Sequence, residues 1–137
     1  MGKPLVGGIY RLSSLFSSTN QGARYKKIAS LSGIDAASVA TVTLTFEAGC
    51  TLYNSVPTHT VVTRLTGTVN GQIARVTDSA TNLTAATTLT TLAATNDRFL
   101  IQHNPVAIKS TGNLSFQTTV GSSAPATIKV EVFGINY

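Results

Sequence analysis

From residue 38 onwards, apolar and polar residues alternate along much of the chain, and this period of two constrains the fold more than any other feature. In residues 41–48, Val42, Leu44, Phe46 and Ala48 alternate with three threonines and Glu47. Residues 128–133 repeat the pattern near the C-terminus. Successive side chains of a β-strand point to opposite faces of a sheet, so the alternation predicts strands with one buried face.

The composition supports an all-β fold. The 137 residues include 22 Thr and 13 Ser, and β-branched threonine favours strands over helices. Charged residues make up only 11% of the chain, which argues against a disordered protein and against a coiled coil. No apolar run approaches the roughly 18 residues of a membrane span, so we expect no membrane partner.

Further strands are expected from the same pattern. The dipeptide Asn70-Gly71 separates two of them and predicts a hairpin with a type I′ turn, in which both central residues have positive φ. Residues 81–95 are ambiguous, and a loop followed by a strand is the favoured interpretation. About eight strands without intervening helices predict a single β-sandwich or barrel over residues 36–137. The other expected strands are 60–69, 72–77, 98–102, 106–109, 114–120 and a last strand over 126–137.

The net charge of +5 is concentrated at the N-terminus. The first 27 residues hold five basic residues and no acidic one, whereas the remainder holds five of each. Residues 1–35 also have weak periodicity and many Gly and Ser residues, so we expect an extended basic arm here. Within the arm, Tyr25, Ile28 and Leu31 recur every three residues before Gly33, which predicts one short helix over residues 23–31.

Few residues in the chain could carry catalysis or bind a metal. The candidates are Cys50, His59, His103 and the five carboxylates Asp35, Glu47, Asp78, Asp97 and Glu131, and no two of them have a short metal-ligand spacing. A lone cysteine after a strand is typical of a small buried apolar residue. Glu47 and Glu131 occupy polar positions of alternating strands, where solvation or a cross-strand ion pair is the ordinary explanation. We therefore expect no enzyme activity, no cofactor and no metal.

The arm combines positive charge with apolar side chains. Three roles are compatible with this combination: docking onto a protein, binding nucleic acid, or forming a solvated tail. Nucleic-acid arms usually contain denser blocks of like charge, so protein docking is the favoured interpretation. The expected docking residues are Lys3, Leu5, Ile9, Tyr10, Arg11, Leu12, Phe16, Arg24, Tyr25, Lys26 and Lys27.

In overall character, and particularly in residues 38–48 and 126–137, the chain resembles virion structural proteins. It is most similar to the jelly-roll head decoration (cement) proteins of tailed bacteriophages. This resemblance implies a jelly-roll order of strands and a virion location on the capsid surface. It also implies a homo-oligomer, with a trimer favoured, that binds the major capsid protein or neighbouring virion subunits and braces the shell.

Three other functions remain open from the sequence. The chain could be the coat protein of a small virus with its arm facing the genome, a tail or fibre component, or a carbohydrate-binding sandwich module. The docking hypothesis predicts that deletion of residues 1–27 leaves a folded β-domain that no longer binds its shell.

Overall fold

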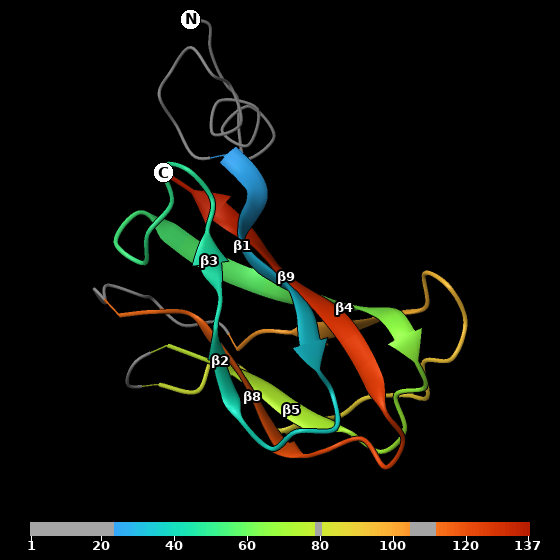
Figure 1. Ribbon diagram of the computed structural model, residues 1–137. Coiled ribbons are helices and arrows are strands. Elements are labelled where there is room, and N and C mark those ends of the chain that lie inside the picture. The colour runs from blue at the N-terminus through green and yellow to red at the C-terminus, as the bar shows by residue number, and fades with distance from the viewer. Residues whose placement is uncertain (1–23, 79–80, 105–111) are drawn as a thin grey trace, which may run out of the picture.

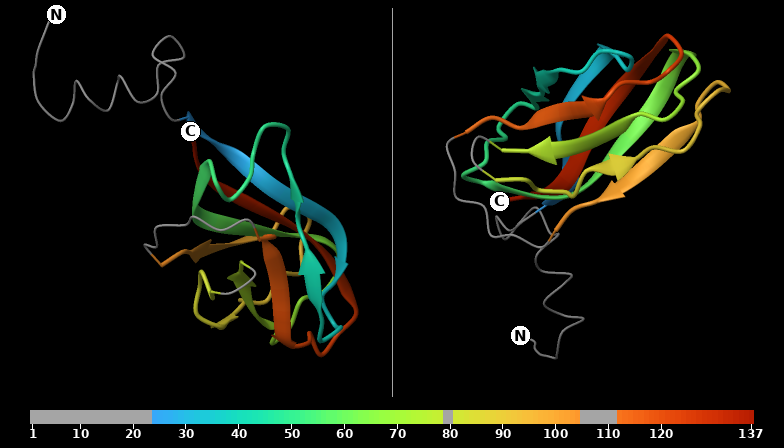
Figure 2. Two further views of the ribbon diagram at one scale, coloured as in Figure 1. Left: turned by 90° about the vertical axis from the view of Figure 1, so that its left-hand side faces the viewer. Right: turned by 90° about the horizontal axis from the view of Figure 1, so that it is seen from below.

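The computed structural model describes residues 24–78, 81–104 and 112–137, and these form an all-β structure of nine strands without a helix. The strands belong to two antiparallel sheets that face each other as a sandwich, which confirms the expected fold class (Figures 1 and 2). No described segment is a helix that could span a membrane. The strands are β1 (Arg24–Asp35), β2 (Thr41–Thr43), β3 (Thr45–Phe46), β4 (Ser55–Gly67), β5 (Ile73–Thr77), β6 (Thr87–Thr88), β7 (Arg98–Gln102), β8 (Ser115–Val120) and β9 (Ala126–Asn136).

The strand order is that of a jelly roll. One sheet has the order β3-β1-β9-β4-β7 and the other has the order β2-β8-β5-β6. The antiparallel pairs β1·β9, β2·β8, β4·β7 and β5·β6 are nested, with the first strand pairing the last and the two middle strands pairing each other. A chain that forms one long hairpin and then rolls it into two layers has this arrangement.

The core lies between the two sheets and follows the alternation in the sequence. Ile128, Val130 and Val132 of β9 are fully buried, and the residues between them are partly exposed. Phe116 of β8 packs into the same core cluster from the opposite sheet. Burial of such side chains contributes roughly 1.5–3 kcal/mol each, so this layer is the main source of stability.

The predicted helix over residues 23–31 is wrong, because Arg24–Asp35 is strand β1 (residue 23 lies outside the described residues). Strand β1 pairs along its length with β9 and has register shifts at Lys27/Ala29 and Leu31/Ile34. At the first shift two consecutive residues, Ile28 and Ala29, are both fully buried. Such bulges interrupt the period of two and produced the spacing of three that suggested a helix. The sandwich therefore includes residues 24–35, which the sequence assigned to the arm.

The predicted hairpin at Asn70-Gly71 is also wrong. Strands β4 and β5 belong to different sheets, so the chain between them crosses from one layer to the other. Gly71 has a φ of 75°, but Asn96 is the only non-glycine residue with positive φ in the described parts of the chain. Asn70 instead contacts the segment before β9: its N–H donates to Ser122 Oγ and its carbonyl accepts from the Ser123 N–H. These tertiary contacts replace the type I′ geometry.

The strand expected at residues 41–48 is divided between the two sheets. Val42 lies in β2 of the four-stranded sheet, and Phe46 lies in β3 of the five-stranded sheet. Buried Leu44 lies between them, and its N–H donates to the Leu114 carbonyl. This division adds one strand to the number expected, and β1 adds another.

The remaining expectations are largely met by the described residues. Strands β7, β8 and β9 lie where strands are expected at 98–102, 114–120 and 126–137, with β8 beginning at Ser115 and β9 ending at Asn136. Residues 81–95 contain mostly loop and the two-residue strand β6. The strand expected at 106–109 lies outside the described residues.

Candidate interaction surface

The outer face of the five-stranded sheet carries aromatic, aliphatic and charged side chains that the strand register brings together. The register aligns His59 of β4 with Phe133 of β9 on one side and with Gln102 of β7 on the other. Val61 is aligned in the same way between Glu131 and Leu100. These residues alternate with buried ones along their strands and so share the face that points away from the core.

Three rings form what we call the aromatic cluster: Tyr25 of β1, Phe133 of β9 and His59 of β4. Their ring centroids are 5.2 Å apart for His59–Phe133, 5.7 Å for Tyr25–His59 and 6.5 Å for Tyr25–Phe133. The ring planes lie within 19° of one another. Tyr25 remains 48% exposed, so the cluster is accessible at the surface. Stacked pairs at these distances contribute beyond simple burial.

Backbone irregularities help to position the aromatic cluster. Register shifts occur between Lys27 and Ala29 in β1 and between Pro57 and His59 in β4, next to two of the three rings. Gly134 follows Phe133 directly, and a Cβ at this position would collide with the Val56 carbonyl oxygen. Strands β9 and β4 therefore approach closely where the rings stack.

The environment of His59 favours the neutral form of its imidazole. Partial burial lowers its pKa, because desolvation disfavours the charged ring. Tyr25 Oη lies 2.9 Å from each of the two ring nitrogens, and Thr58 Oγ1 lies 3.2 Å from Nδ1. A neutral imidazole has one donor and one acceptor nitrogen, so the tautomer decides which of these contacts are hydrogen bonds.

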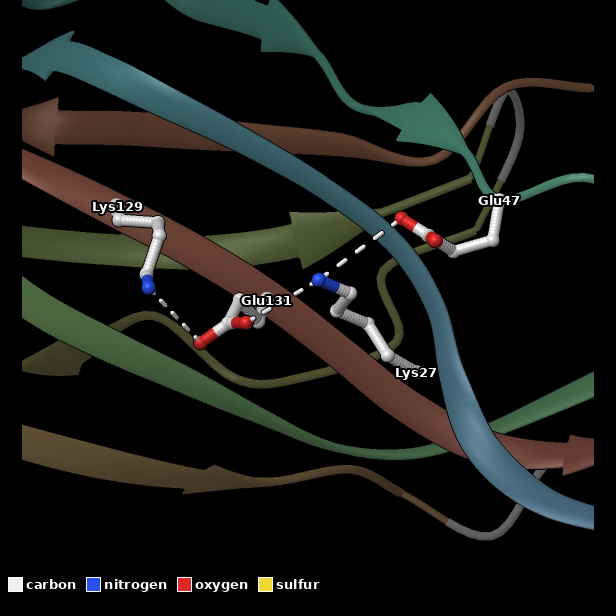
Figure 3. A network of polar contacts seen from close by, with 4 residues as sticks. All are labelled: Lys27, Glu47, Lys129 and Glu131. Atoms are coloured by element: carbon white, nitrogen blue, oxygen red, sulfur yellow. Dashed lines mark hydrogen bonds and ion pairs between the residues drawn. The ribbon is translucent and has the colours of Figure 1, made fainter.

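A network of four charged side chains lies on the same face, as Figure 3 shows. Lys27 Nζ lies 3.5 Å from Glu131 Oε2 and 4.0 Å from Glu47 Oε2, and Lys129 Nζ lies 3.7 Å from Glu131 Oε1. Of the two explanations considered for Glu47 and Glu131, solvation or a cross-strand ion pair, the structure shows the ion pair, in both cases with Lys27. The lysines are more than one-third exposed, so each pair contributes at most about 1 kcal/mol.

Only the last four expected docking residues lie in the described part of the chain. Tyr25 belongs to the aromatic cluster and Lys27 to the charge network, and Arg24 and Lys26 lie beside them in β1. These four residues are therefore part of the sheet. Lys3, Leu5, Ile9, Tyr10, Arg11, Leu12 and Phe16 lie outside the described residues.

The residues before Arg24 are joined to a defined end of the sandwich, which we call the attachment end. Arg24 pairs with Asn136, which also pairs with Ser55. The Tyr137 N–H donates to the Asn54 carbonyl at the same place. Tyr137 and the loop residue Tyr53 are both about two-thirds exposed, so the attachment end presents tyrosines besides Tyr25.

The other candidates for chemistry are dispersed. Cys50 is buried as a free thiol, and Asp97 accepts hydrogen bonds from the Ala93 and Ala94 N–H groups, which lower its pKa. His103 is buried, with Nε2 2.7 Å from Thr60 Oγ1. Within residues 24–78, 81–104 and 112–137, no group of three or more His, Cys, Asp or Glu side chains could hold a metal ion.

Comparison of the chain with protein-family models gives no match. Comparisons with curated proteins and with solved structures give no match either.

Proposed function

We propose that the chain is a virion structural protein, a decoration protein that binds the outside of a capsid and stabilises the shell by bridging coat subunits. The observation that carries the proposal is the position of the attachment end. Residues 1–23 contain two basic residues, Lys3 and Arg11, and several apolar ones. They are joined to the sandwich at Arg24, which lies beside the aromatic cluster and the exposed Tyr53 and Tyr137. We therefore expect a partner that binds residues 1–23 to contact this aromatic surface as well.

The energetics of such a contact favour apolar anchors over charge. Ordering a segment on a partner costs roughly 1–2 kcal/mol of backbone entropy per residue. Burial of apolar area returns about 25 cal/mol per Å², so side chains such as Leu5, Ile9 and Phe16 must supply most of the binding energy. Exposed cations add little once salt screens them.

The jelly-roll sandwich suits a shell protein, although folds of this kind also occur in lectins and enzymes. Nearly balanced charge in residues 28–137 limits long-range repulsion between closely packed copies. Several copies on one shell would also combine weak contacts through effective concentration.

The first test locates the chain on its particle. Particles purified from the source would be labelled with antibodies raised against residues 24–137, and we expect labelling of the outer surface of intact shells. Label at the tail would favour the tail or fibre alternative, and label only after disruption would favour an internal role.

The second test asks which residues bind. Shells stripped of the chain would be incubated with the full chain, with residues 24–137, with a Leu5→Ser/Ile9→Ser/Phe16→Ser variant, or with a Lys3→Gln/Arg11→Gln variant. We expect co-sedimentation of the full chain and the charge variant, and loss of binding for the truncated chain and the apolar variant. Binding that follows the charges and falls steeply with salt would favour nucleic acid instead.

The aromatic cluster supports one alternative, a carbohydrate-binding module. Sugar rings stack their C–H faces on exposed aromatic side chains, and Tyr25 is half exposed. A glycan array separates the two functions: binding that is lost in Tyr25→Ala, with retained circular dichroism, would replace the capsid proposal.

A further inference from the structure

Strand β7 has an open edge. It is the last strand of the five-stranded sheet, and β4 is its only neighbouring strand among the described residues. In the right-hand view of Figure 2 it is the lighter orange strand at the lower right edge. The Arg64 N–H donates to the Asp97 carbonyl and the His103 N–H donates to the Thr58 carbonyl. The N–H and C=O groups of every second residue in an antiparallel strand face the same neighbouring strand. Since residues 97 and 103 face β4, Phe99 and Ile101 between them also bond to β4. The N–H and C=O groups of Arg98, Leu100 and Gln102 therefore point away from the sheet.

The side chains of this edge offer little protection against pairing. Proteins usually block open edges with charges, proline or bulges, because unpaired backbone groups recruit other strands. Strand β7 contains no proline, and its pairing with β4 has no register shift. Its central residue is Leu100, which is 56% exposed, and its only charge is Arg98 at one end.

We infer that β7 pairs with β7 of a second copy of this chain, antiparallel about a two-fold axis at Leu100, so that the two five-stranded sheets become continuous. In this register Leu100 lies opposite Leu100 of the second copy, and Arg98 lies opposite Gln102. Each of these pairs exchanges two backbone hydrogen bonds, and all the outward-pointing groups of the strand are used.

The register is specific for chemical reasons. The two Arg98 side chains lie at opposite ends of the paired strands, about 13 Å apart, where salt screens their repulsion. A shift by two residues in one direction would bring Asn96 into the ladder, and its φ of 68° is incompatible with an extended strand. A shift by two in the other direction would separate the two leucines and leave Arg98 without a partner in β7.

This pairing goes beyond the proposed function, since it concerns contacts between copies of the chain in solution. It also differs from the trimer that the resemblance implies. A two-fold contact is self-complementary and closes as a dimer.

Disulfide trapping tests the register directly. In a Cys50→Ala background, Leu100→Cys places two thiols opposite each other with Cα atoms about 5.5 Å apart, which a disulfide can span. Gln102→Cys is the matched control, because its own copy lies about 13 Å away. After mild oxidation of the full chain, we expect a covalent dimer for Leu100→Cys and a monomer for Gln102→Cys on a non-reducing gel. Equal cross-linking of both variants, or none of either, would overturn the inference.

A second variant tests the edge itself. Leu100→Pro removes only an outward-pointing N–H and leaves the bonds to β4 in place, whereas Leu100→Val keeps that N–H. By sedimentation velocity we expect dimers for the native chain and Leu100→Val, and monomers for Leu100→Pro with an unchanged circular dichroism spectrum. A native chain that is monomeric or trimeric at all concentrations, or a folded Leu100→Pro variant that remains dimeric, would contradict the pairing.

Discussion

The His103 side chain is buried next to β4, where Nε2 contacts Thr60 Oγ1 and Nδ1 has no hydrogen-bond partner within the described residues. Burial, and to a smaller extent the nearby His59, together lower the pKa of His103 to about 4. Protonation would place a charge where water cannot solvate it, so the folded protein holds this ring in its neutral form.

This burial predicts a pH dependence of stability. The pKa of His103 is about 6.5 in the unfolded chain and about 4 in the folded one, so the unfolded state binds more protons between these values. The free energy of unfolding is therefore highest above about pH 6.5 and falls by roughly 3 kcal/mol as the pH decreases to about 4. Urea denaturation across this range measures the loss.

The matched variants are His103→Gln and His59→Gln. We expect His103→Gln to remove most of the pH-dependent loss, and His59→Gln to remove little, because His59 is only partly buried. Identical pH profiles for the native chain and His103→Gln would show that other groups control acid stability.

Among the elements, the end of β4 is where the chain leaves one sheet for the other. Gly67 has a φ of 72°, and a Cβ there would collide with the Pro125 carbonyl oxygen and the Ala126 Cα. Gly71, in the same connection, has a φ of 75° but open space around it. An alanine at Gly71 would therefore meet only backbone strain, whereas an alanine at Gly67 would meet backbone strain and a steric clash.

We predict different costs for alanine at these two positions. Gly71→Ala should lower the free energy of unfolding by about 1 kcal/mol, the cost of positive φ for an alanine. Gly67→Ala should cost roughly 3 kcal/mol or more, because two backbone segments must also move apart. Chemical denaturation of both variants measures the difference, and equal costs would contradict the close approach.

Because strand β1 begins at Arg24, the deletion of residues 1–27 suggested by the sequence would remove part of the sandwich. Deletion of residues 1–27 would remove Tyr25 from the aromatic cluster and Lys27 from its ion pairs, and would leave residues 133–136 of β9 without a neighbour on one side. We expect residues 24–137 to unfold at nearly the same temperature as the full chain. Residues 28–137 should lose at least about 2 kcal/mol, measured by thermal unfolding followed by circular dichroism. Equal stability of the two truncated chains would contradict a structural role for residues 24–27.

Alternation predicted β8 and β9 because their inward positions are regularly apolar or hydroxyl-bearing. It failed at β1, where bulges shift the phase, and at residues 41–48, where one alternating stretch is divided between two sheets. Neither feature is encoded in the local pattern, because both depend on strands distant in sequence.

At the scale of the whole molecule, composition and turn spacing were sufficient to predict a β-sandwich, but the order of strands required knowledge of pairing. The same limit applies to the candidate site. The sequence predicts Tyr25 as a docking residue, whereas its neighbours His59 and Phe133 join it only through the register of β1, β9 and β4. The open edge of β7 likewise depends on which strand ends the sheet.

The central position of β9 in its sheet has a consequence for synthesis on the ribosome. This strand, the last of the nine, is the one that joins β3-β1 to β4-β7. Until Asn136 has left the exit tunnel, a nascent chain can form only two separate halves of that layer, each with exposed apolar surface. Completion of this layer must therefore wait until the whole of β9 has emerged, and a product terminated before β9 would be left for chaperones and proteases.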